Sequence, residues 1–255
     1  MEIKSFKKLK DNRYKVELDN NEVITLYDDV IVEYNLLFNK VMDEKKLKEI
    51  VNKNSEKEAY YLAIKMLNTK MRTAKEINKQ LKKKDISSTV INNIIDKLYQ
   101  EKYLDDERYI KAYVNDQVNL SINGPLKIKR ELVELGFNEL DIDSYLNTID
   151  EEIWLTKIDK YITKKLKASS NLSAYKLKIK VINELVNKGY KKDMVTEMIG
   201  NYEFKNSDDL LIKEYNKIKR KLESKYAGSE LNYYIKAKLL AKGFILEEIE
   251  KVIGD

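Results

Sequence analysis

The sequence contains no cysteine and no histidine. The first absence excludes disulfide bonds, thiolate nucleophiles and zinc–sulfur sites, and the second removes the commonest general base and metal ligand. Carboxylate chemistry is not excluded, but the sequence shows no glycine-rich phosphate loop and no acidic motif with metal-ligand spacing. We therefore expect a protein that is not an enzyme, with no catalytic residue, no cofactor and no bound metal.

Proline and glycine are also scarce, with one proline and seven glycines among 255 residues. Together with 36% charged and 43% hydrophobic residues, this composition favours long helices over a loop-rich β protein. No run of 18 uncharged apolar residues occurs, and the first ten residues have no apolar signal core. We expect a cytoplasmic protein that does not associate with membranes.

A pattern of apolar residues recurs four times along the chain. Each copy has apolar residues at offsets −8, −4, +1, +6, +9 and +10 from an anchor, and the anchors are Asp85, Gly136, Gly189 and Gly243. The anchors lie 51, 53 and 54 residues apart, a period typical of a tandem repeat protein. The spacing places the apolar residues on one face of a helix before the anchor and on one face of a helix after it.

Glycine at the anchor suits the left-handed backbone conformation that ends a helix. Asp85 is the exception, and aspartate adopts this conformation more readily than most residues. Each copy is therefore interpreted as helix, tight turn, helix. A further amphipathic segment precedes each copy, so we predict repeats of three helices.

The predicted fold is mainly α, with about four tandem three-helix repeats in an extended, curved array and a small β-rich segment at the N-terminus. The repeats are expected to cover residues 56–102, 103–150, 151–204 and 205–255. Residues 1–54 are expected to form a separate segment of a β-meander and helices.

The N-terminal segment begins with three stretches of alternating polarity, residues 3–10, 14–18 and 22–27, which predict a three-stranded antiparallel meander. Two helices are expected next, over residues 29–39 and 43–52. The first helix of the first repeat is then expected to begin near residue 56.

Helix starts are marked by capping residues. Asp43 and Ser173 are expected N-caps, and Thr73 with Glu76 has the spacing of a capping box. Either Ser87 or Ser88 is expected to cap the next helix, and the single proline, at position 125, fits the first turn of another.

Positive charge is concentrated in two runs, in a chain of net charge +6. Residues 65–84 hold eight basic residues against Glu76 alone, and residues 155–192 hold eleven against Asp159 and Glu184. Such a run is usually a solvated helix face. Here opposite charges are almost lacking, so we give binding to phosphates or to an acidic protein surface the same weight as a solvated face. The candidate contact residues are Lys70, Arg72, Lys75, Lys79, Lys82, Lys83, Lys84, Lys127, Arg130, Lys164, Lys165, Lys176 and Lys180. Lys176, Lys178 and Lys180 alternate in sequence and cannot share one helical face.

Two other features have structural explanations. Asp105 and Asp106 resemble a carboxylate pair, but acidic residues at a helix start accept backbone N–H bonds, so we assign them no catalytic role. Most of the 18 tyrosines fall in apolar stripes and are expected in cores, as is Trp154. In the adjacent pairs at 60–61 and 233–234, only one tyrosine of each pair is expected to point inward, which leaves its neighbour for surface contacts.

Three motifs of the sequence resemble those of the RecX family of proteins. Residues 103–109, Tyr-Leu-Asp-Asp-Glu-Arg-Tyr, followed by Ala-Tyr at 112–113, are similar to the Gly-Tyr-Leu-Asp-Asp motif that joins the first two repeats of that family. The Gly-Pro of 124–125, with Ile128 and the Glu-Leu of 131–132, is similar to a second family motif, and Arg-Thr at 72–73 before Glu76 to a third. The resemblance covers about residues 59–255. Lys102 and Asp85 stand where the family favours glycine.

The resemblance implies a regulator of the RecA recombinase. RecX proteins bind in the groove of the RecA filament on single-stranded DNA, limit its extension or promote its loss, and thereby restrain strand exchange and the SOS response. We expect the same partners here, namely the RecA filament and single-stranded DNA, the latter bound either directly or through RecA. We also expect the protein to be a monomer. The alternatives are a helical-repeat nucleic-acid-binding protein that acts without RecA, and an enzyme that uses carboxylates.

Overall fold

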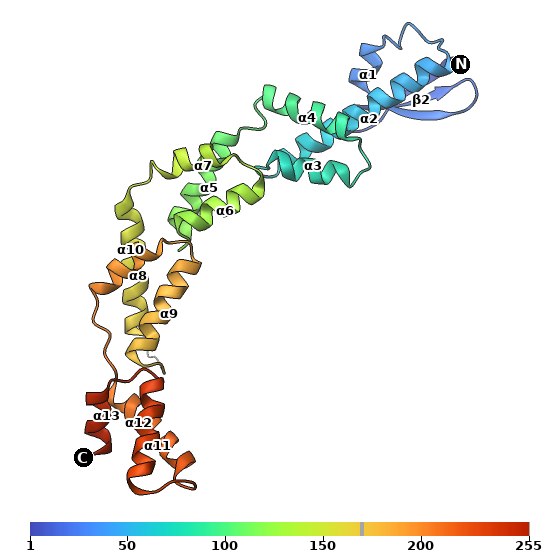
Figure 1. The fold of residues 1–255 in the computed structure, drawn as a ribbon. Helices are drawn as coiled ribbons and strands as arrows, with labels where there is room; N and C mark the ends of the chain where they lie inside the picture. The colour runs from blue at the N-terminus through green and yellow to red at the C-terminus, as the bar shows by residue number, and fades with distance from the viewer. Residues whose placement is uncertain (169–170, 255) are drawn as a thin grey trace. The chain divides into compact units, whose positions relative to one another are not determined.

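The computed structural model describes residues 1–168 and 171–254. It contains two compact units, Met1–Tyr109 and Ile110–Asp255, each of which is described by itself. Figure 1 labels the helices of both units. Residues 168–172 are mostly polar, which predicts a linker between two helices, and they lie partly outside the described residues.

The first unit begins with a three-stranded sheet. Strands β1 (Ile3–Lys8), β2 (Arg13–Leu18) and β3 (Val23–Tyr27) pair antiparallel in the order β1-β2-β3, which confirms the predicted meander. The turns between strands contain Asp11, Asn12 and Asn21, all with φ between 58° and 63°. Asparagine and aspartate tolerate this left-handed conformation, so the turn chemistry fixes where each strand ends.

Helix α1 (Asp28–Glu33) is shorter than the helix expected over residues 29–39, so that prediction is wrong at its C-terminal end. The helix ends because Asn35 adopts φ 52° and the Leu36 N–H donates to the Ile31 carbonyl at 2.9 Å. Leu36 is buried beside Ile31 in the core of the N-terminal region. A left-handed asparagine followed by a buried apolar residue closes the helix much as glycine does elsewhere.

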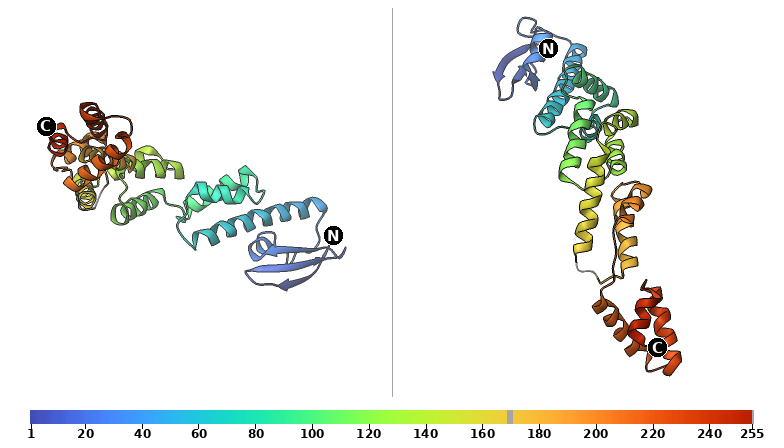
Figure 2. Two further views of the ribbon diagram at one scale, coloured as in Figure 1. Left: turned by 90° about the horizontal axis from the view of Figure 1, so that it is seen from below. Right: turned by 90° about the vertical axis from the view of Figure 1, so that its left-hand side faces the viewer.

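Helix α2 (Glu44–Leu67) runs continuously through the point where we expected two separate helices. Asp43 caps it as predicted, since its side chain accepts from the Lys46 N–H at 2.7 Å. The expected break at residues 53–55 is wrong because Asn54 turns its amide toward the sheet. Its Oδ1 accepts from the Tyr27 N–H at 2.9 Å and its Nδ2 donates to the Thr25 carbonyl at 3.0 Å. Figure 2 shows α2 lying along the meander.

The remaining described elements are helices, so the mainly α fold class is confirmed. In chain order they are α3 (Ala74–Lys82), α4 (Ser88–Gln100), α5 (Asp106–Leu120), α6 (Pro125–Leu135), α7 (Glu139–Leu146), α8 (Glu151–Lys167), α9 (Ala174–Asn187), α10 (Lys192–Gly200), α11 (Asp208–Leu222), α12 (Gly228–Ala241) and α13 (Leu246–Ile253). The boundary between the two units falls inside α5.

The fourfold apolar pattern forms the centre of the helical cores. The residues at offsets −8, −4 and +6 are 0% exposed in all four copies: Ile77, Leu81, Ile91, Ile128, Leu132, Ile142, Val181, Leu185, Val195, Ile235, Leu239 and Ile249. All four anchors have positive φ, from 58° at Asp85 to 102° at Gly136. After each glycine anchor, the next N–H donates at 3.2 Å to the leucine carbonyl five residues earlier, at Phe137, Tyr190 and Phe244.

The predicted caps are also present. Thr73 and Glu76 form a complete capping box on α3, and Ser87 rather than Ser88 caps α4. Pro125 occupies the first turn of α6. Ser173 accepts from the Lys176 N–H, and its hydroxyl donates to the Lys242 carbonyl at 2.6 Å, so it also ties α9 to the turn after α12.

Candidate functional site

The basic run of the first unit lies on the outer side of helix α3. Ile77 and Leu81 are buried on the inner side, whereas Lys79 and Lys82 are exposed. Lys83 and Lys84, which follow in the helix end and turn, are exposed too, as are Lys70 and Lys75. These lysines are therefore directed away from the core and are exposed to solvent.

The single carboxylate in this run, that of Glu76, is engaged in contacts at the start of helix α3. Glu76 Oε2 accepts from the Thr73 N–H at 3.0 Å, and Arg72 Nη1 lies 3.4 Å from Glu76 Oε1. Within the part of the chain that the structure describes, Lys79, Lys82, Lys83 and Lys84 form no ion pair. The face therefore keeps its positive charge and can attract a polyanion.

Three other candidate residues are partly neutralised by neighbouring carboxylates. Besides Arg72, Lys127 Nζ lies 4.0 Å from Glu131, and Lys165 Nζ lies 2.8 Å from Glu184. The hydrogen bond to Glu184 raises the pKa of Lys165. Burial acts to raise the pKa of Glu184, but the bonds from Lys165 and Tyr161 outweigh it, and this pKa is lowered. These three cations therefore form ion pairs within the fold, in addition to any contact that they make with a ligand.

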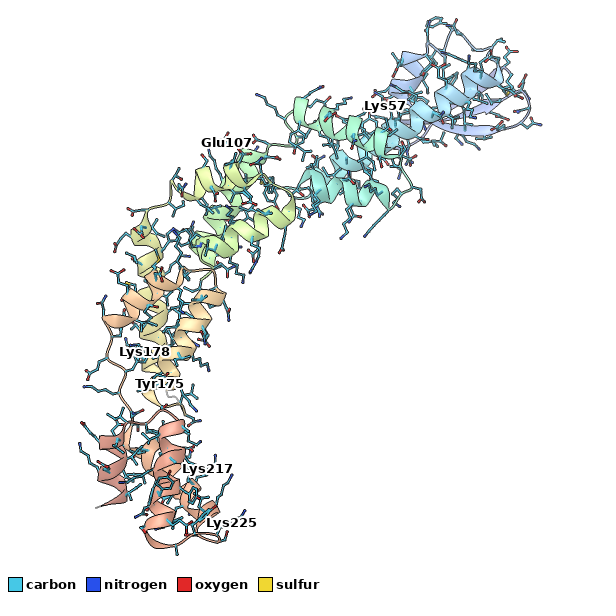
Figure 3. The ribbon with its side chains drawn as sticks, viewed as in Figure 1. Lys57, Glu107, Tyr175, Lys178, Lys217 and Lys225 are labelled. Carbon is cyan, nitrogen blue, oxygen red and sulfur yellow. The ribbon has the colours of Figure 1, made fainter. Side chains whose placement is uncertain are left out.

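The basic run of the second unit is spread over two helices. Lys164 is exposed at the end of α8, and Lys176 and Lys180 are exposed one turn apart on α9. Lys178 is exposed as well, and it lies near the exposed Tyr175 (Figure 3). Arg130 is exposed on α6. Unlike the lysines of α3, these cations do not gather on one helix face.

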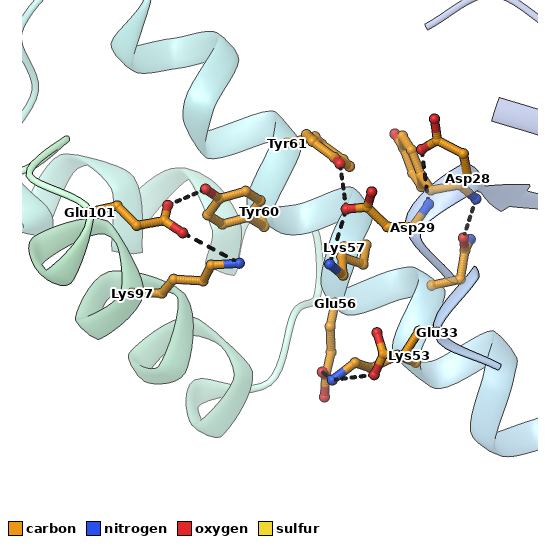
Figure 4. A network of polar contacts seen from close by, with 12 residues as sticks. Asp28, Asp29, Glu33, Lys53, Glu56, Lys57, Tyr60, Tyr61, Lys97 and Glu101 are labelled. Atoms are coloured by element: carbon orange, nitrogen blue, oxygen red, sulfur yellow. Dashed lines mark hydrogen bonds and ion pairs between the residues drawn. The ribbon is translucent and has the colours of Figure 1, made fainter. Parts of the chain in front are cut away.

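The tyrosine pair at 60–61 differs from the prediction, because neither ring is left free. Tyr61 stacks on Tyr27 with ring centroids 4.8 Å apart and donates its hydroxyl to Asp29 at 2.7 Å. Tyr60 faces α4 instead, where its hydroxyl donates to Glu101 (Figure 4). The prediction failed because α2 is packed on two sides, by the meander and by α4. The pair at 233–234 behaves as predicted, with Tyr233 69% exposed and its neighbour packed on the core.

The carboxylate pair at the start of α5 is structural, as predicted. Asp105 accepts from the Arg108 N–H at 2.9 Å, and Asp106 accepts from the Tyr99 hydroxyl at 2.8 Å. No group of three or more acidic side chains among residues 1–168 and 171–254 is arranged to hold a metal ion. Trp154 is buried, as expected.

Sequence reasoning missed a groove of about 830 Å³ in the first unit. The meander contributes Arg13 and Tyr27 to it, α2 contributes Tyr61 and Lys65, and the turn after α3 contributes Lys84. Asp11, which also lines it, pairs with Arg13 at 3.4 Å. No local sequence signal marks this groove, because its walls come from segments that only the fold brings together.

Among the described helices, none combines the length and the apolar character needed to cross a membrane.

Comparison with known proteins gives a consistent result. The family model described as "RecX, first three-helix domain" matches residues 59–98. The "Regulatory protein RecX" of Streptococcus agalactiae is 31% identical over 95% of this chain and 95% of its own length. That of Bacillus velezensis is 30% identical over 98% and 97%.

Solved structures agree in fold. A crystal structure of regulatory protein RecX is 27% identical, with a TM-score of 0.69 over 79% of this chain and 99% of that chain. The crystal structure of RecX from Lactobacillus salivarius is 25% identical, with a TM-score of 0.50 over 57% and 94%. Since relatives at 30% identity or more are matched over nearly their whole length, and their three-helix fold is found here, this chain belongs to the RecX family of regulatory proteins.

Proposed function

We propose that this protein binds the RecA filament on single-stranded DNA and thereby restrains homologous recombination, DNA repair and the SOS response. The observation that carries the proposal is the match to regulatory RecX proteins along nearly the whole chain. The lysines of α3 add a face that suits the polyanionic part of such a filament.

The proposed mechanism is binding without catalysis. The four copies of the apolar pattern place helices in equivalent positions at regular intervals of sequence, and a filament presents similar surfaces at regular intervals along its axis. Several weak contacts of this kind add through their effective concentration. The protein then acts in the bacterial cytoplasm as a monomer, with no cofactor and no membrane.

The test is the DNA-dependent ATPase activity of RecA from the same organism, titrated with this protein well below one molecule per RecA. Binding to the bare single-stranded DNA is measured in parallel. Inhibition at the low ratio, with weak binding to bare DNA, supports action on the filament. Inhibition only when the DNA is saturated contradicts it, because simple competition for DNA then accounts for the effect.

A second candidate function is nucleic-acid binding without RecA, which Lys79, Lys82, Lys83 and Lys84 favour, because they form no ion pair within the described residues. Steep salt dependence and sequence preference on naked DNA are expected in that case. The outer face of α3 carries no arginine to read base edges, since its exposed cations are lysines. Contacts to phosphates therefore suit it better than sequence recognition.

A further inference from the structure

The helices that precede the four anchors, α3, α6, α9 and α12, are called here the anchor helices. Their residues at offsets −8 and −4 are buried in every copy. Offsets −10, −6, −3 and −2 lie on the opposite side of a helix of 3.6 residues per turn. The residues at these four offsets are exposed in all four anchor helices. Each helix therefore shows solvent an equivalent face, and the chemistry of these faces can be compared directly.

The face of α3 is entirely basic. Its four positions hold Lys75, Lys79, Lys82 and Lys83. In the other three anchor helices, offsets −10 and −3 hold apolar pairs instead: Leu126 with Val133, Ile179 with Val186, and Tyr233 with Leu240. These six side chains are between 36% and 69% exposed.

The apolar pairs form a regular series within the second unit. The two members of each pair are seven residues apart, so they lie two turns apart on one side of the helix. A single exposed apolar side chain is ordinary on a protein surface. The same two positions are apolar in three consecutive copies, however, whereas in the first copy they are Lys75 and Lys82, so the apolar character follows the repeats of the second unit.

The lysine face and the faces with apolar pairs differ in charge, and they are therefore suited to different ligands. The remaining positions of the face are Asn183 and Asn187 in α9, Ala237 and Ala241 in α12, and the oppositely charged Arg130 and Glu134 in α6, so none of these three faces carries a net charge at the four offsets. At these offsets they have no net positive charge to attract phosphates, whereas the lysine face of α3 does. An uncharged, partly apolar helix face is complementary to an apolar protein surface.

We infer that α6, α9 and α12 dock through their apolar pairs onto equivalent apolar patches of successive identical protein subunits, while α3 faces nucleic acid. The inference rests on the proposed function, in which the subunits are those of the RecA filament. It divides the binding surface of this chain into one part for nucleic acid and one for protein. Lys176 and Lys180 flank the apolar pair of α9 and fit an acidic rim on such a patch.

The test compares two variants with equal numbers of changes. One carries Leu126→Gln, Ile179→Gln and Tyr233→Gln, and the other carries Lys79→Gln, Lys82→Gln and Lys83→Gln. Both sets change exposed positions, all of them within a helix except the C-cap Lys83, to a good helix former, so thermal melts should stay near that of the wild type. Affinity is measured for RecA assembled on single-stranded DNA and for the bare DNA, each at low and high salt.

We expect the apolar-face variant to bind the filament about tenfold or more weakly, equally at both salt concentrations, with bare-DNA binding unchanged. The lysine variant should bind bare DNA more weakly at low salt. Each single glutamine substitution should give part of the effect, because the docking faces are repeated.

Three results would overturn the inference. If the apolar-face variant binds the filament as tightly as the wild type does, the inference is wrong and the proposed function is unaffected. Absence of filament binding by the wild type removes both. Self-association of the wild type that the apolar-face variant abolishes, measured by sedimentation, would instead assign these faces to a second copy of this chain.

Discussion

Gly189 shows how single residues hold consecutive copies of the pattern together. It ends the turn after α9 with φ 91°, and Gly124 at the start of α6 lies directly against it. The Gly124 N–H donates to the Lys188 carbonyl at 2.6 Å, and the Leu126 N–H donates to the Gly189 carbonyl at 3.1 Å. Two backbones approach this closely only because neither glycine has a Cβ.

We predict that Gly189→Ala destabilises the second unit by at least about 2 kcal/mol, from the positive φ and from the clash together. A Cβ at this position would lie 2.3 Å from the backbone nitrogen of Lys127. Gly200→Ala is the matched control, since a Cβ there meets nothing within 4 Å and its effect should stay within about 1 kcal/mol. Urea denaturation measures both, and equal effects would show that the close approach does not matter.

Asp29 and Tyr61 form the residue-scale link between α1 and α2. The hydrogen bond from Tyr61 and then that from Lys57 lower the pKa of Asp29. Burial and the bond to Asp29 raise the pKa of Tyr61 to about 12. The hydroxyl therefore stays protonated at neutral pH and donates to a charged carboxylate.

A lowered carboxyl pKa in the folded state stabilises the protein above the unfolded pKa, and this contribution disappears as the pH falls through the folded pKa. Tyr61→Phe should therefore reduce stability at pH 7 by less than about 1 kcal/mol, since Asp29 is half-exposed, and by less still in acid. Denaturation at both pH values measures the change. Tyr233→Phe, at an exposed ring, should show no such pH dependence, and a pH-independent loss of stability in Tyr61→Phe would exclude the ionic contribution.

At the scale of elements, the anchor turns could be predicted from sequence and the continuity of α2 could not. Apolar residues recur at offsets −8, −4 and +6 because the helices of each copy pack on one another in the same way. The complete burial of these residues could therefore be predicted. Asn54 and Ser55 look like linker residues, and only the edge of the meander gives Asn54 its partners. The two-sided packing of Tyr60 and Tyr61 follows from the same continuous helix.

We predict that Asn54→Ala loosens the meander from α2 and costs about 1–3 kcal/mol, because it leaves the Tyr27 N–H and the Thr25 carbonyl without their partner. Asn52→Ala, at an exposed position of the same helix, is the control and should be nearly neutral. Amide hydrogen exchange at β3 reports the effect locally. Unchanged protection of the Tyr27 amide would contradict this assignment.

At the scale of the whole molecule, the chemistry of the surface changes between the two units. The first unit carries the lysine face of α3 and, beside it, the groove lined by Arg13 and Lys65. The second carries the apolar pairs. The lysine face was predictable because its residues are close in sequence, whereas Arg13 and Lys65 meet only through tertiary packing, which no pattern in the sequence encodes.

The salt dependence of binding distinguishes the lysine face from the net charge of the chain. Replacing Lys79, Lys82, Lys83 and Lys84 by alanine should weaken binding to single-stranded DNA, with or without RecA, and leave the first unit folded, because all four side chains are exposed. The slope of log affinity against log salt should fall by about 0.7 for each phosphate that the variant no longer neutralises. The charge-matched control replaces four exposed lysines of α11 and the turn that follows it, Lys217, Lys219, Lys221 and Lys225, of which Figure 3 labels the first and the last. If the slope falls equally in both variants, net charge alone accounts for the attraction and α3 has no special part in it. If it falls only in the α3 variant, the phosphates lie on that helix.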